Sequence, residues 1–467
     1  MRIRVSPGGV LAGEARVPGD KSIAHRLLLL AAVGSGRSVV GGLPPALDVA
    51  ATARACVALL GDGGARLEAW LGNIEGRGSE EGHLEVGPEV EVEGAGREAL
   101  RAPAGPMDCG NSGTTMRLLA GVLSAARFPA TLDGDASLRA RPMERVADPL
   151  RRMGAVVETT DGRPPVAVRG APLTGIRHET PVPSAQVKGA VLLAGIAAEG
   201  TTEVVEPAQT RDHTERLLSA LGASVRQTRA DTRRADSKGA PAAVGRGCSV
   251  AVERFEVPSF SATTPGDVSS AAFLAGAAVL TGGAVAVHGV GLNPSRLRFL
   301  DVLGRMGARV EQEVDARELG EPAGTLRVAS GGTLSGTTVT PAELPEVIDE
   351  IPLLAVVAAG AAGESRFEGA GELRVKESDR LAGLRELIRG LGGEADVDGD
   401  ALVVRGGGLE GGVVDGGGDH RMAMAAVVGA LAARRPSEVL GTEAAAVSYP
   451  GFATSLRHLG ARLEVAR

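Results

Sequence analysis

The hydrophobic positions of the chain follow one local pattern that recurs six times. In each copy, a leucine-rich stretch with helical spacing runs into a glycine, and a short strand-like alternation follows. A glycine suits the left-handed backbone that ends a helix. The six marker residues are Gly64, Gly154, Gly222, Gly307, Gly392 and Gly460. Their spacing is too long for a solenoid repeat, so we expect six small units of helix and strand.

The copies divide evenly, because three precede residue 260 and three follow it. A chain of 467 residues also exceeds one ordinary hydrophobic core. We therefore expect an α/β (α+β) protein of two domains with three units each. A polar stretch from Gln227 to Gly247 interrupts the pattern, and we interpret it as a surface insertion.

Composition excludes several classes of function. The formal net charge is -7 and aromatic residues make up 2% of the chain, which argues against a nucleic-acid partner. The apolar run from Leu27 to Val33 is too short to span a bilayer, and no signal peptide is recognisable. We expect a cytoplasmic protein that binds no membrane. Cys56, Cys109 and Cys248 are too scattered for a disulfide framework or a zinc site. No metal-ligand spacing stands out and no dinucleotide-binding GxGxxG follows a strand, so no metal or cofactor is expected.

Lysine, arginine and hydroxyl side chains gather where apolar helices are expected to begin. Unpaired N–H groups and the helix dipole make such a start a natural anion site, which basic side chains reinforce. The segments are PGDKSIAHR (18–26), CGNSGTTMR (109–117), RPM (141–143), PSAQVKGA (183–190), TRDHTER (210–216) and DHRMAM (419–424). We expect the chain to bind small substrates with several negative charges.

The richest polar region surrounds two acidic residues, Asp349 and Glu350, which precede a long apolar run. Lys376, Glu377 and Arg380 follow in ELRVKESDR, where the spacing places Lys376 and Arg380 on one face of a helix. Two cations so close repel each other unless an anion lies between them. A solvated charged helix is the ordinary alternative, but the apolar surroundings favour a functional site.

These segments resemble the 5-enolpyruvylshikimate-3-phosphate synthases. The likeness covers nearly the whole chain, with the motifs in the same order. The two motifs GDKS-x-x-HR and ELRVKESDR are together specific for this family, because both would rarely occur in one chain by chance. The resemblance implies two domains, each with three βαβαββ units in a pseudo-threefold, inverse α/β barrel-like arrangement. It places crossings near residues 17–20 and 261–267, so that residues 1–19 and 265–467 form one domain and residues 20–264 the other.

The resemblance also implies an activity and its residues. Members transfer the enolpyruvyl group of phosphoenolpyruvate to the 5-hydroxyl of shikimate 3-phosphate, without a cofactor, on the route to aromatic amino acids. Residues expected to bind shikimate 3-phosphate are Lys21, Ser22, Arg26, Ser184, Ala185, Gln186, Arg211, Asp349 and Lys376. Those expected to bind phosphoenolpyruvate are Lys21, Gly113, Arg141, Gln186, Arg380 and Arg421.

Catalytic roles follow from the same comparison. Asp349 is expected to accept the hydroxyl proton and Glu377 to act near the methylene carbon, with Lys376 and Lys21 completing the set. Val447 stands where some members have a lysine that touches phosphoenolpyruvate. Gly113 is typical of forms that are sensitive to the herbicide glyphosate. We expect a monomer whose partners are its two substrates.

Three other functions remain open from the sequence. The related transferase that adds enolpyruvate to UDP-N-acetylglucosamine shares the repeated units, but it is expected to carry a reactive loop cysteine. Cys109 lacks a nearby histidine base and is better explained as a structural thiol. A non-catalytic repeat protein that binds a metabolite would not need Asp349 and Glu377 among cations. A nucleotide-dependent phosphotransferase would need a phosphate-binding loop that the sequence lacks.

Overall fold

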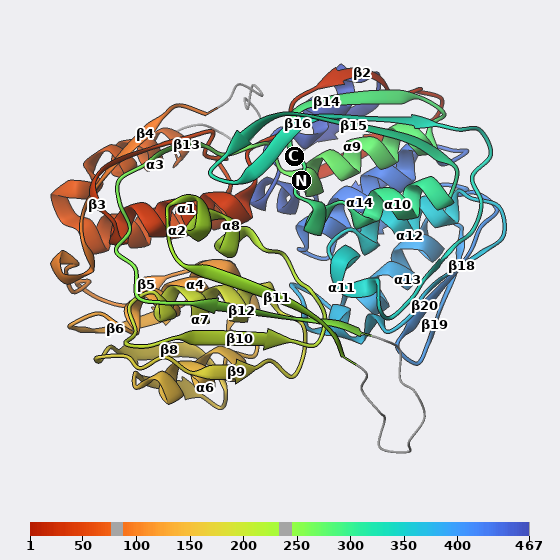
Figure 1. Ribbon diagram of the computed structural model, residues 1–467. Coiled ribbons are helices and arrows are strands. Elements are labelled where there is room, and N and C mark those ends of the chain that lie inside the picture. The colour runs from red at the N-terminus through yellow and green to blue at the C-terminus, as the bar shows by residue number, and fades with distance from the viewer. Residues whose placement is uncertain (76–86, 233–244, 467) are drawn as a thin grey trace.

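The computed structural model describes residues 1–75, 87–232 and 245–466. Residues 233–244, in the predicted insertion, lie outside the described residues. The described chain forms two lobes that lie side by side (Figure 1). One hydrophobic cluster runs from Ile23 to Ala262 and forms the core of the first lobe. The core of the second lobe combines residues 3–17 with residues 268–463.

Six small sheets repeat one pairing pattern in the described part of the chain: a parallel pair of strands extended by antiparallel pairs. The first lobe holds β13-β3-β4 (Ser261–Thr263, Ser35–Gly41, Val90–Ala95), β5-β6-β8-β7 (Met107–Asp108, Pro129–Asp133, Arg163–Arg169, Val156–Thr160) and β11-β12-β10-β9 (Val225–Thr232, Gly245–Val252, Thr202–Glu206, Arg177–Glu179). The second lobe holds β15-β16-β14-β2 (Ala308–Glu318, Glu321–Ser330, Ala284–Gly291, Ala12–Ala15), β17-β18-β20-β19 (Thr338–Val339, Glu364–Phe367, Ala401–Arg405, Glu394–Asp398) and β21-β22-β1-β23 (Val413–Asp415, Ser437–Leu440, Arg2–Val5, Leu463–Ala466).

Helices fill the interior of both lobes. The first lobe contains α1 (Lys21–Val33), α2 (Leu47–Leu60), α3 (Ala65–Glu75), α4 (Gly113–Leu123), α5 (Ala136–Arg139), α6 (Glu144–Met153), α7 (Ala185–Gly195) and α8 (His213–Ala220). The second contains α9 (Val268–Leu280), α10 (Arg298–Arg305), α11 (Leu344–Val347), α12 (Ile351–Ala359), α13 (Arg380–Gly390), α14 (His420–Leu431) and α15 (Phe452–His458). Short 3₁₀ turns are η1 (Gly61–Gly64), η2 (Arg97–Ala99), η3 (Pro294–Arg296), η4 (Ala370–Val375) and η5 (Thr442–Val447).

Six of these helices are buried almost completely: α1, α4 and α7 in the first lobe, and α9, α12 and α14 in the second. A helix that is apolar on all sides can only be stable inside a core. The sheets therefore cover the helices, which is the inverse of an ordinary α/β barrel.

The lobes are joined where the chain crosses between them twice, at residues 17–20 and 264–267, which we call the crossing segments. They run antiparallel, with a bridge between Gly19 and Gly266. The N–H of Asp20 donates to the carbonyl oxygen of Pro265, and that of Asp267 to the carbonyl oxygen of Pro18, both at 2.7 Å. Glycine is required at position 19, because a Cβ there would lie 2.0 Å from the carbonyl oxygen of Gly42.

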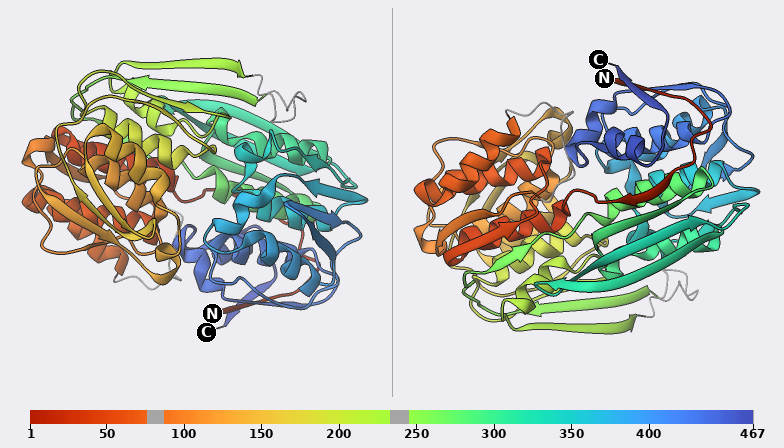
Figure 2. Two further views of the ribbon diagram at one scale, coloured as in Figure 1. Left: turned by 90° about the horizontal axis from the view of Figure 1, so that it is seen from below. Right: turned by 90° about the horizontal axis from the view of Figure 1, so that it is seen from above.

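Strand pairing is exchanged across this crossing. β2 precedes α1 of the first lobe but pairs in parallel with β14 of the second. Likewise, β13 precedes α9 of the second lobe but pairs with β3 of the first. Figure 2 shows the two ends of the chain close together on the second lobe, where β1 pairs with both β22 and β23.

Five of the six predicted helix–glycine–strand junctions are confirmed. Gly154, Gly222, Gly307, Gly392 and Gly460 have φ values between 77° and 116°, and a strand follows each of them. The junction predicted at Gly64 is wrong, because residues 65–75 form α3. Leu67, Trp70 and Leu71 have helical spacing and are buried, which favours a helix over a strand.

Close packing of α4 against α7 gives a testable consequence. A Cβ on Gly121 of α4 would lie 2.2 Å from the carbonyl oxygen of Ala190 in α7. Gly121→Ala must therefore push the two helices apart. We expect overpacking of roughly 1–3 kcal/mol and a fall in melting temperature of about 2–10 °C, measured by scanning calorimetry.

Gly304→Ala is the matched control, because a Cβ at this exposed position of α10 would meet no described atom within 4 Å. Alanine has the higher helix propensity, so the melting temperature should stay constant or rise. Equal falls in the two variants would contradict the packing argument.

Candidate active site

A cavity of about 680 Å³ lies between the lobes, and residues from both line its wall. The first lobe contributes Lys21, Ser22, Gly113, Arg141, Ser184, Ala185, Gln186 and Arg211. The second contributes Asp349, Lys376, Glu377 and Arg421. The structure thus brings together twelve of the fourteen residues that the sequence predicted for the site.

All six buried helices begin at this cavity. The wall includes Lys21 of α1, Gly113 of α4 and Gln186 of α7, and also Asp267, Asp349 and Arg421 at the starts of α9, α12 and α14. The N-terminal end of a helix carries a partial positive charge and unpaired N–H groups. Six such ends facing one space make a strong site for anions.

In the first lobe, polar side chains connect the start of α7 with that of α4, and the start of α1 with that of α2. Gln186 donates to the hydroxyl of Thr114 at 2.8 Å and accepts a hydrogen bond from Arg117. The ammonium of Lys21 lies 2.8 Å from the carboxylate of Asp48. These contacts hold the amide of Gln186 and the ammonium of Lys21 at the cavity wall.

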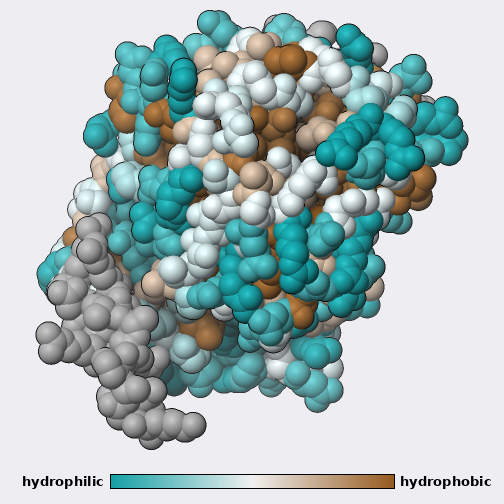
Figure 3. Space-filling view, turned by 90° about the vertical axis from the view of Figure 1, so that its right-hand side faces the viewer, coloured by the Kyte–Doolittle hydropathy of each residue, from teal (hydrophilic) through white to brown (hydrophobic). Residues whose placement is uncertain are grey.

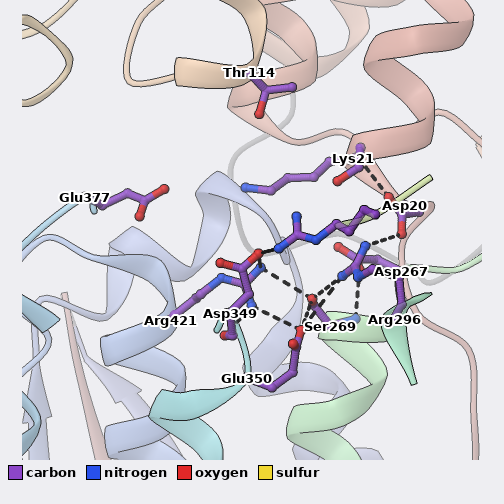
Figure 4. A network of polar contacts seen from close by, with 12 residues as sticks. Asp20, Lys21, Thr114, Asp267, Ser269, Arg296, Asp349, Glu350, Glu377 and Arg421 are labelled. Carbon is purple, nitrogen blue, oxygen red and sulfur yellow. Dashed lines mark hydrogen bonds and ion pairs between the residues drawn. The ribbon is translucent and has the colours of Figure 1, made fainter. Parts of the chain in front are cut away.

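In the second lobe, Asp349 is surrounded by arginines. Arg211, from the first lobe, forms an ion pair with its carboxylate. A nitrogen of Arg421 lies 3.6 Å from the same carboxylate, and another donates to the Asp349 carbonyl oxygen at 2.8 Å. Asp349 therefore contacts cations from both lobes, and Figure 4 shows it facing Arg421 and the central cavity.

Glu377 and Lys376 have strongly altered proton affinities. Burial disfavours the charged form of Glu377, but the charges of Arg380, Arg141 and Lys21 outweigh this effect and hold its pKa well below the usual range. Burial lowers the pKa of Lys376 to about 8, although Glu377 opposes the shift. In the free protein, Glu377 is a carboxylate, while Lys376 is mostly an ammonium at neutral pH and loses its proton as the pH rises through about 8.

Lys376 and Arg380 do not share a helical face, so that sequence prediction is wrong. The side chain of Asp379 accepts a hydrogen bond from the N–H of Ala382 and starts α13 at Arg380. Lys376 lies in the preceding segment, just after η4. An aspartate with this capping geometry stops the helix from extending back to Lys376.

Arg26 and Arg380 are absent from the cavity wall, with exposed fractions of 3% and 1%. Arg26 donates to the hydroxyl of Thr214 and the carbonyl oxygen of Ser22, so it braces α1 against α8. Arg380 bonds Asp419 at 2.8 Å and Glu377 at 2.6 Å. Their direct contact with a substrate stays a prediction.

Several residues of the wall were not among the predicted site residues: Asp48, Asn111, Thr114, Arg117, Arg145, Asp267, Arg296, Glu372 and His420. Asn111, Thr114 and Arg117 belong to the motif that identified Gly113, and Arg117 follows Gly113 by one helical turn. Burial and the charges of Arg145 and Arg141 lower the pKa of Arg117 to about 9. Burial and the charges of Lys21 and Arg421 hold the pKa of His420 well below its ordinary value, so its imidazole is neutral.

The cysteines are buried thiols. Burial, with the charges of Asp108 and Asp133, raises the pKa of Cys109 to about 12, so this thiol remains protonated and is a poor nucleophile. Among residues 1–75, 87–232 and 245–466, no group of three His, Cys, Asp or Glu side chains is arranged to hold a metal ion. No helix in those ranges is long and apolar enough to cross a membrane.

Comparisons with known proteins identify one family along nearly the whole chain. The family model "EPSP synthase (3-phosphoshikimate 1-carboxyvinyltransferase)" matches residues 5–456. The chain is 44% identical to the 3-phosphoshikimate 1-carboxyvinyltransferase of Acidithiobacillus ferrooxidans over 466 residues, which cover 100% of this chain and 99% of that protein. It is 43% identical to the enzyme of the same name from Alkalilimnicola ehrlichii over 456 residues, covering 97% and 94% of the two chains.

A solved EPSP synthase structure from Acinetobacter baumannii is similar to this fold with a TM-score of 0.80 and 35% identity, covering 100% of both chains. The predicted α/β fold of two domains is confirmed by this likeness and by the mixed sheets described above. The matches to the family model, to relatives and to a solved structure all span the motifs that line the cavity. The chain therefore belongs to the EPSP synthase (3-phosphoshikimate 1-carboxyvinyltransferase) family.

Proposed function

We propose that the chain transfers the enolpyruvyl group of phosphoenolpyruvate to the 5-hydroxyl of shikimate 3-phosphate and releases inorganic phosphate. The observation that carries this proposal is the anion cavity, where motif residues surround the carboxylates of Asp349 and Glu377. These motifs lie within residues 5–456, which match the family model. Both substrates carry a phosphate and a carboxylate, so a cavity with six helix starts suits them.

The positions of the polar and basic side chains indicate where each substrate would bind. Ser22, Ser184, Ala185 and Gln186 lie in the first lobe and would bind shikimate 3-phosphate, with Lys376 and Asp349 approaching from the second. Phosphoenolpyruvate would lie between Arg141 of the first lobe and Arg421 of the second. Arginine presents a planar fork that matches phosphate and carboxylate geometry.

The reaction proceeds by an addition and then an elimination, and both steps need proton transfers. Asp349 would accept the proton of the 5-hydroxyl as its oxygen adds to the second carbon of phosphoenolpyruvate, while the methylene carbon gains a proton. Loss of a proton from the resulting methyl group and cleavage of the carbon–oxygen bond to phosphate then yield the enol ether. Glu377 is the candidate acid near that carbon. Two bound anions raise its pKa above that in the free protein.

Further parts of the proposal concern the whole molecule. We propose domain boundaries at residues 19/20 and 264/265, supported by the two separate hydrophobic cores. We also propose a cytoplasmic monomer. The large hydrophobic side chains that are exposed are dispersed along the described chain, for example Val10, Val156 and Val413. On the outer face of the second lobe, Figure 3 shows hydrophobic residues scattered among hydrophilic ones.

Phosphate release tests the function. Purified protein should release phosphate from phosphoenolpyruvate with shikimate 3-phosphate, and not with UDP-N-acetylglucosamine. Release only with the UDP-sugar would contradict the proposal and favour the cell-wall transferase. Release with neither would favour a binding protein without catalytic activity.

The predicted proton acceptor can be tested by Asp349→Asn, which keeps the size of the side chain and removes its basic carboxylate. A well-placed base typically increases a rate by a factor of ~10²–10⁴, so we expect kcat to decrease by a factor in this range. Asp398→Asn, in an exposed ion pair with Arg366, is the control and should stay within about twofold. An Asp349→Asn variant with wild-type kcat would exclude this residue as the base.

The pH dependence of shikimate 3-phosphate binding should depend on Lys376. Its ammonium attracts the anionic substrate below about pH 8, and this attraction is lost as the pH rises through that value. Calorimetry between about pH 7 and 8.5 should show falling affinity as Lys376 loses its proton.

Lys376→Arg keeps the positive charge throughout this range, so its affinity should change less with pH than that of the wild type. Parallel loss of affinity in the two proteins would assign the titration to another group.

Gly113 leaves room for two cations. A Cβ at this position would lie 2.7 Å from a guanidinium nitrogen of Arg117 and 3.1 Å from one of Arg141. We expect Gly113→Ala to displace these groups and raise the KM for phosphoenolpyruvate roughly tenfold, equivalent to about 1.4 kcal/mol. Inhibition by glyphosate, expected for the wild type, should weaken in the same variant.

Gly105→Ala is the control, since a Cβ there would meet no described atom within 4 Å. Its steady-state kinetics should match those of the wild type. An unchanged KM in Gly113→Ala would show that Arg117 and Arg141 can move without affecting phosphoenolpyruvate.

A further inference from the structure

One buried arginine occupies the junction of the two crossing segments. Arg296, at the end of η3, is 3% exposed and lies at the inner wall of the cavity. Its two terminal nitrogens point to different partners. One donates to the carboxylate of Asp20 at 3.3 Å, and the other to the hydroxyl of Ser269 at 2.5 Å. The carboxylates of Asp267 and Glu350 each lie 3.8 Å from the second nitrogen.

The partners of Arg296 belong to an internal duplication. The sequences Pro-Gly-Asp-Lys-Ser (18–22) and Pro-Gly-Asp-Val-Ser (265–269) occupy equivalent places in the two crossings. The first aspartate, Asp20, accepts hydrogen bonds from the N–H groups of Ser22 and Ile23 and caps α1. The second, Asp267, accepts one from the N–H of Ser269 and caps α9. Arg296 therefore connects the starts of one buried helix from each lobe.

On the side of the first lobe, this contact governs the start of α1. Asp20 is 2% exposed and directly precedes Lys21, a predicted ligand of both substrates. Because the carboxylate of Asp20 caps the helix and also accepts from Arg296, any movement of the arginine shifts the first turn of α1. The orientation of Lys21 depends on that turn.

On the side of the second lobe, the contact continues through Ser269. Its hydroxyl donates to Glu350 at 2.5 Å and accepts from Arg421 at 3.4 Å. Arg421 in turn contacts Asp349, the residue before Glu350. Figure 4 shows this connection as a continuous series of contacts from Asp20 through Arg296 and Ser269 to Arg421 and Asp349.

We propose that Arg296 is a positioning residue for the transfer reaction, which sets Lys21 of one lobe against Arg421 and Asp349 of the other. The inference rests on the proposed function. The guanidinium reaches Asp20 and Ser269 with two separate nitrogens held in a rigid fork, whereas the three N–H donors of a lysine ammonium all start from one nitrogen on a flexible stem. A cation is also needed here to balance the buried carboxylates of Asp20, Asp267 and Glu350.

Arg296→Lys keeps the charge and removes the fork. Phosphoenolpyruvate is bound between the lobes, so misalignment should lower kcat/KM for this substrate by roughly 10²-fold, as expected for a displacement of about 1 Å. The dissociation constant of shikimate 3-phosphate, measured alone by calorimetry, should rise by a much smaller factor than the loss in kcat/KM. Lys21 and Asp349 belong to this series, but Ser184, Ala185 and Gln186 would still hold that substrate without contacting it. Arg305→Lys, on the exposed surface of α10, is the control and should match the wild type.

A second variant tests the route. Ser269→Ala removes one hydroxyl and leaves the contact of Arg296 with Asp20, so we expect kcat/KM for phosphoenolpyruvate to fall about tenfold. If Arg296 acts through Ser269, the double variant should lose less than the product of the two single effects. Multiplicative losses would overturn this route. If Arg296→Lys proves unfolded by circular dichroism, the kinetics of Ser269→Ala decide the question alone.

The outcomes separate this inference from the proposed function. A wild-type protein without phosphate release contradicts the function itself. An active wild type with an Arg296→Lys variant within about twofold in kcat/KM overturns only the positioning role. Equal weakening for both substrates, together with a lowered melting temperature, would reduce Arg296 to a structural residue and also overturn the inference.

Discussion

The constraint on which the molecule depends is electrostatic: six buried helices begin at one cavity, and each brings a partial positive charge. Lys21, Arg141, Arg211 and Arg421 add full charges to the same space. Such an arrangement is stable only if carboxylates or bound anions neutralise it. The protein supplies part of that neutralisation itself, through pairs such as Lys21 with Asp48 and Arg211 with Asp349. Anionic substrates supply the rest and are bound where the field is strongest.

The division into two lobes follows from this constraint. If all six helices belonged to one body, their positive ends would be fixed at close range. Placing three in each lobe lets the cavity form between two bodies, and the chain passes from one to the other at the crossing segments, where backbone hydrogen bonds and buried ion pairs meet. Contacts across the cavity, such as Arg145 with Glu372 at 3.1 Å, hold the lobes together from the opposite side.

Local signals in the sequence predicted most of the fold and most of the site. Glycines that end helices and residues that cap them act within a few positions, so Gly154 and Ser184 could be read from their neighbours. Distant contacts decide what the sequence does not show. The junction at Gly64 was predicted wrongly, because Leu67, Trp70 and Leu71 pack into a core as a helix. Arg26 lies behind the cavity wall, where it donates to the hydroxyl of Thr214, and its contact with a substrate stays a prediction. Asp48 was missed because its role depends on Lys21, a partner in another helix.

The exchanged strands bear on the order in which the molecule can fold during synthesis. The first lobe lacks one parallel partner until β13 emerges, since β3 pairs with it. β1 and β2 of the second lobe emerge early, yet β1 finds its partners only when β22 and β23 have been made. Such distant pairings close large loops and slow folding. During that interval, β1 and β2 expose unpaired edges, and the nascent chain is open to wrong pairing or to capture by chaperones.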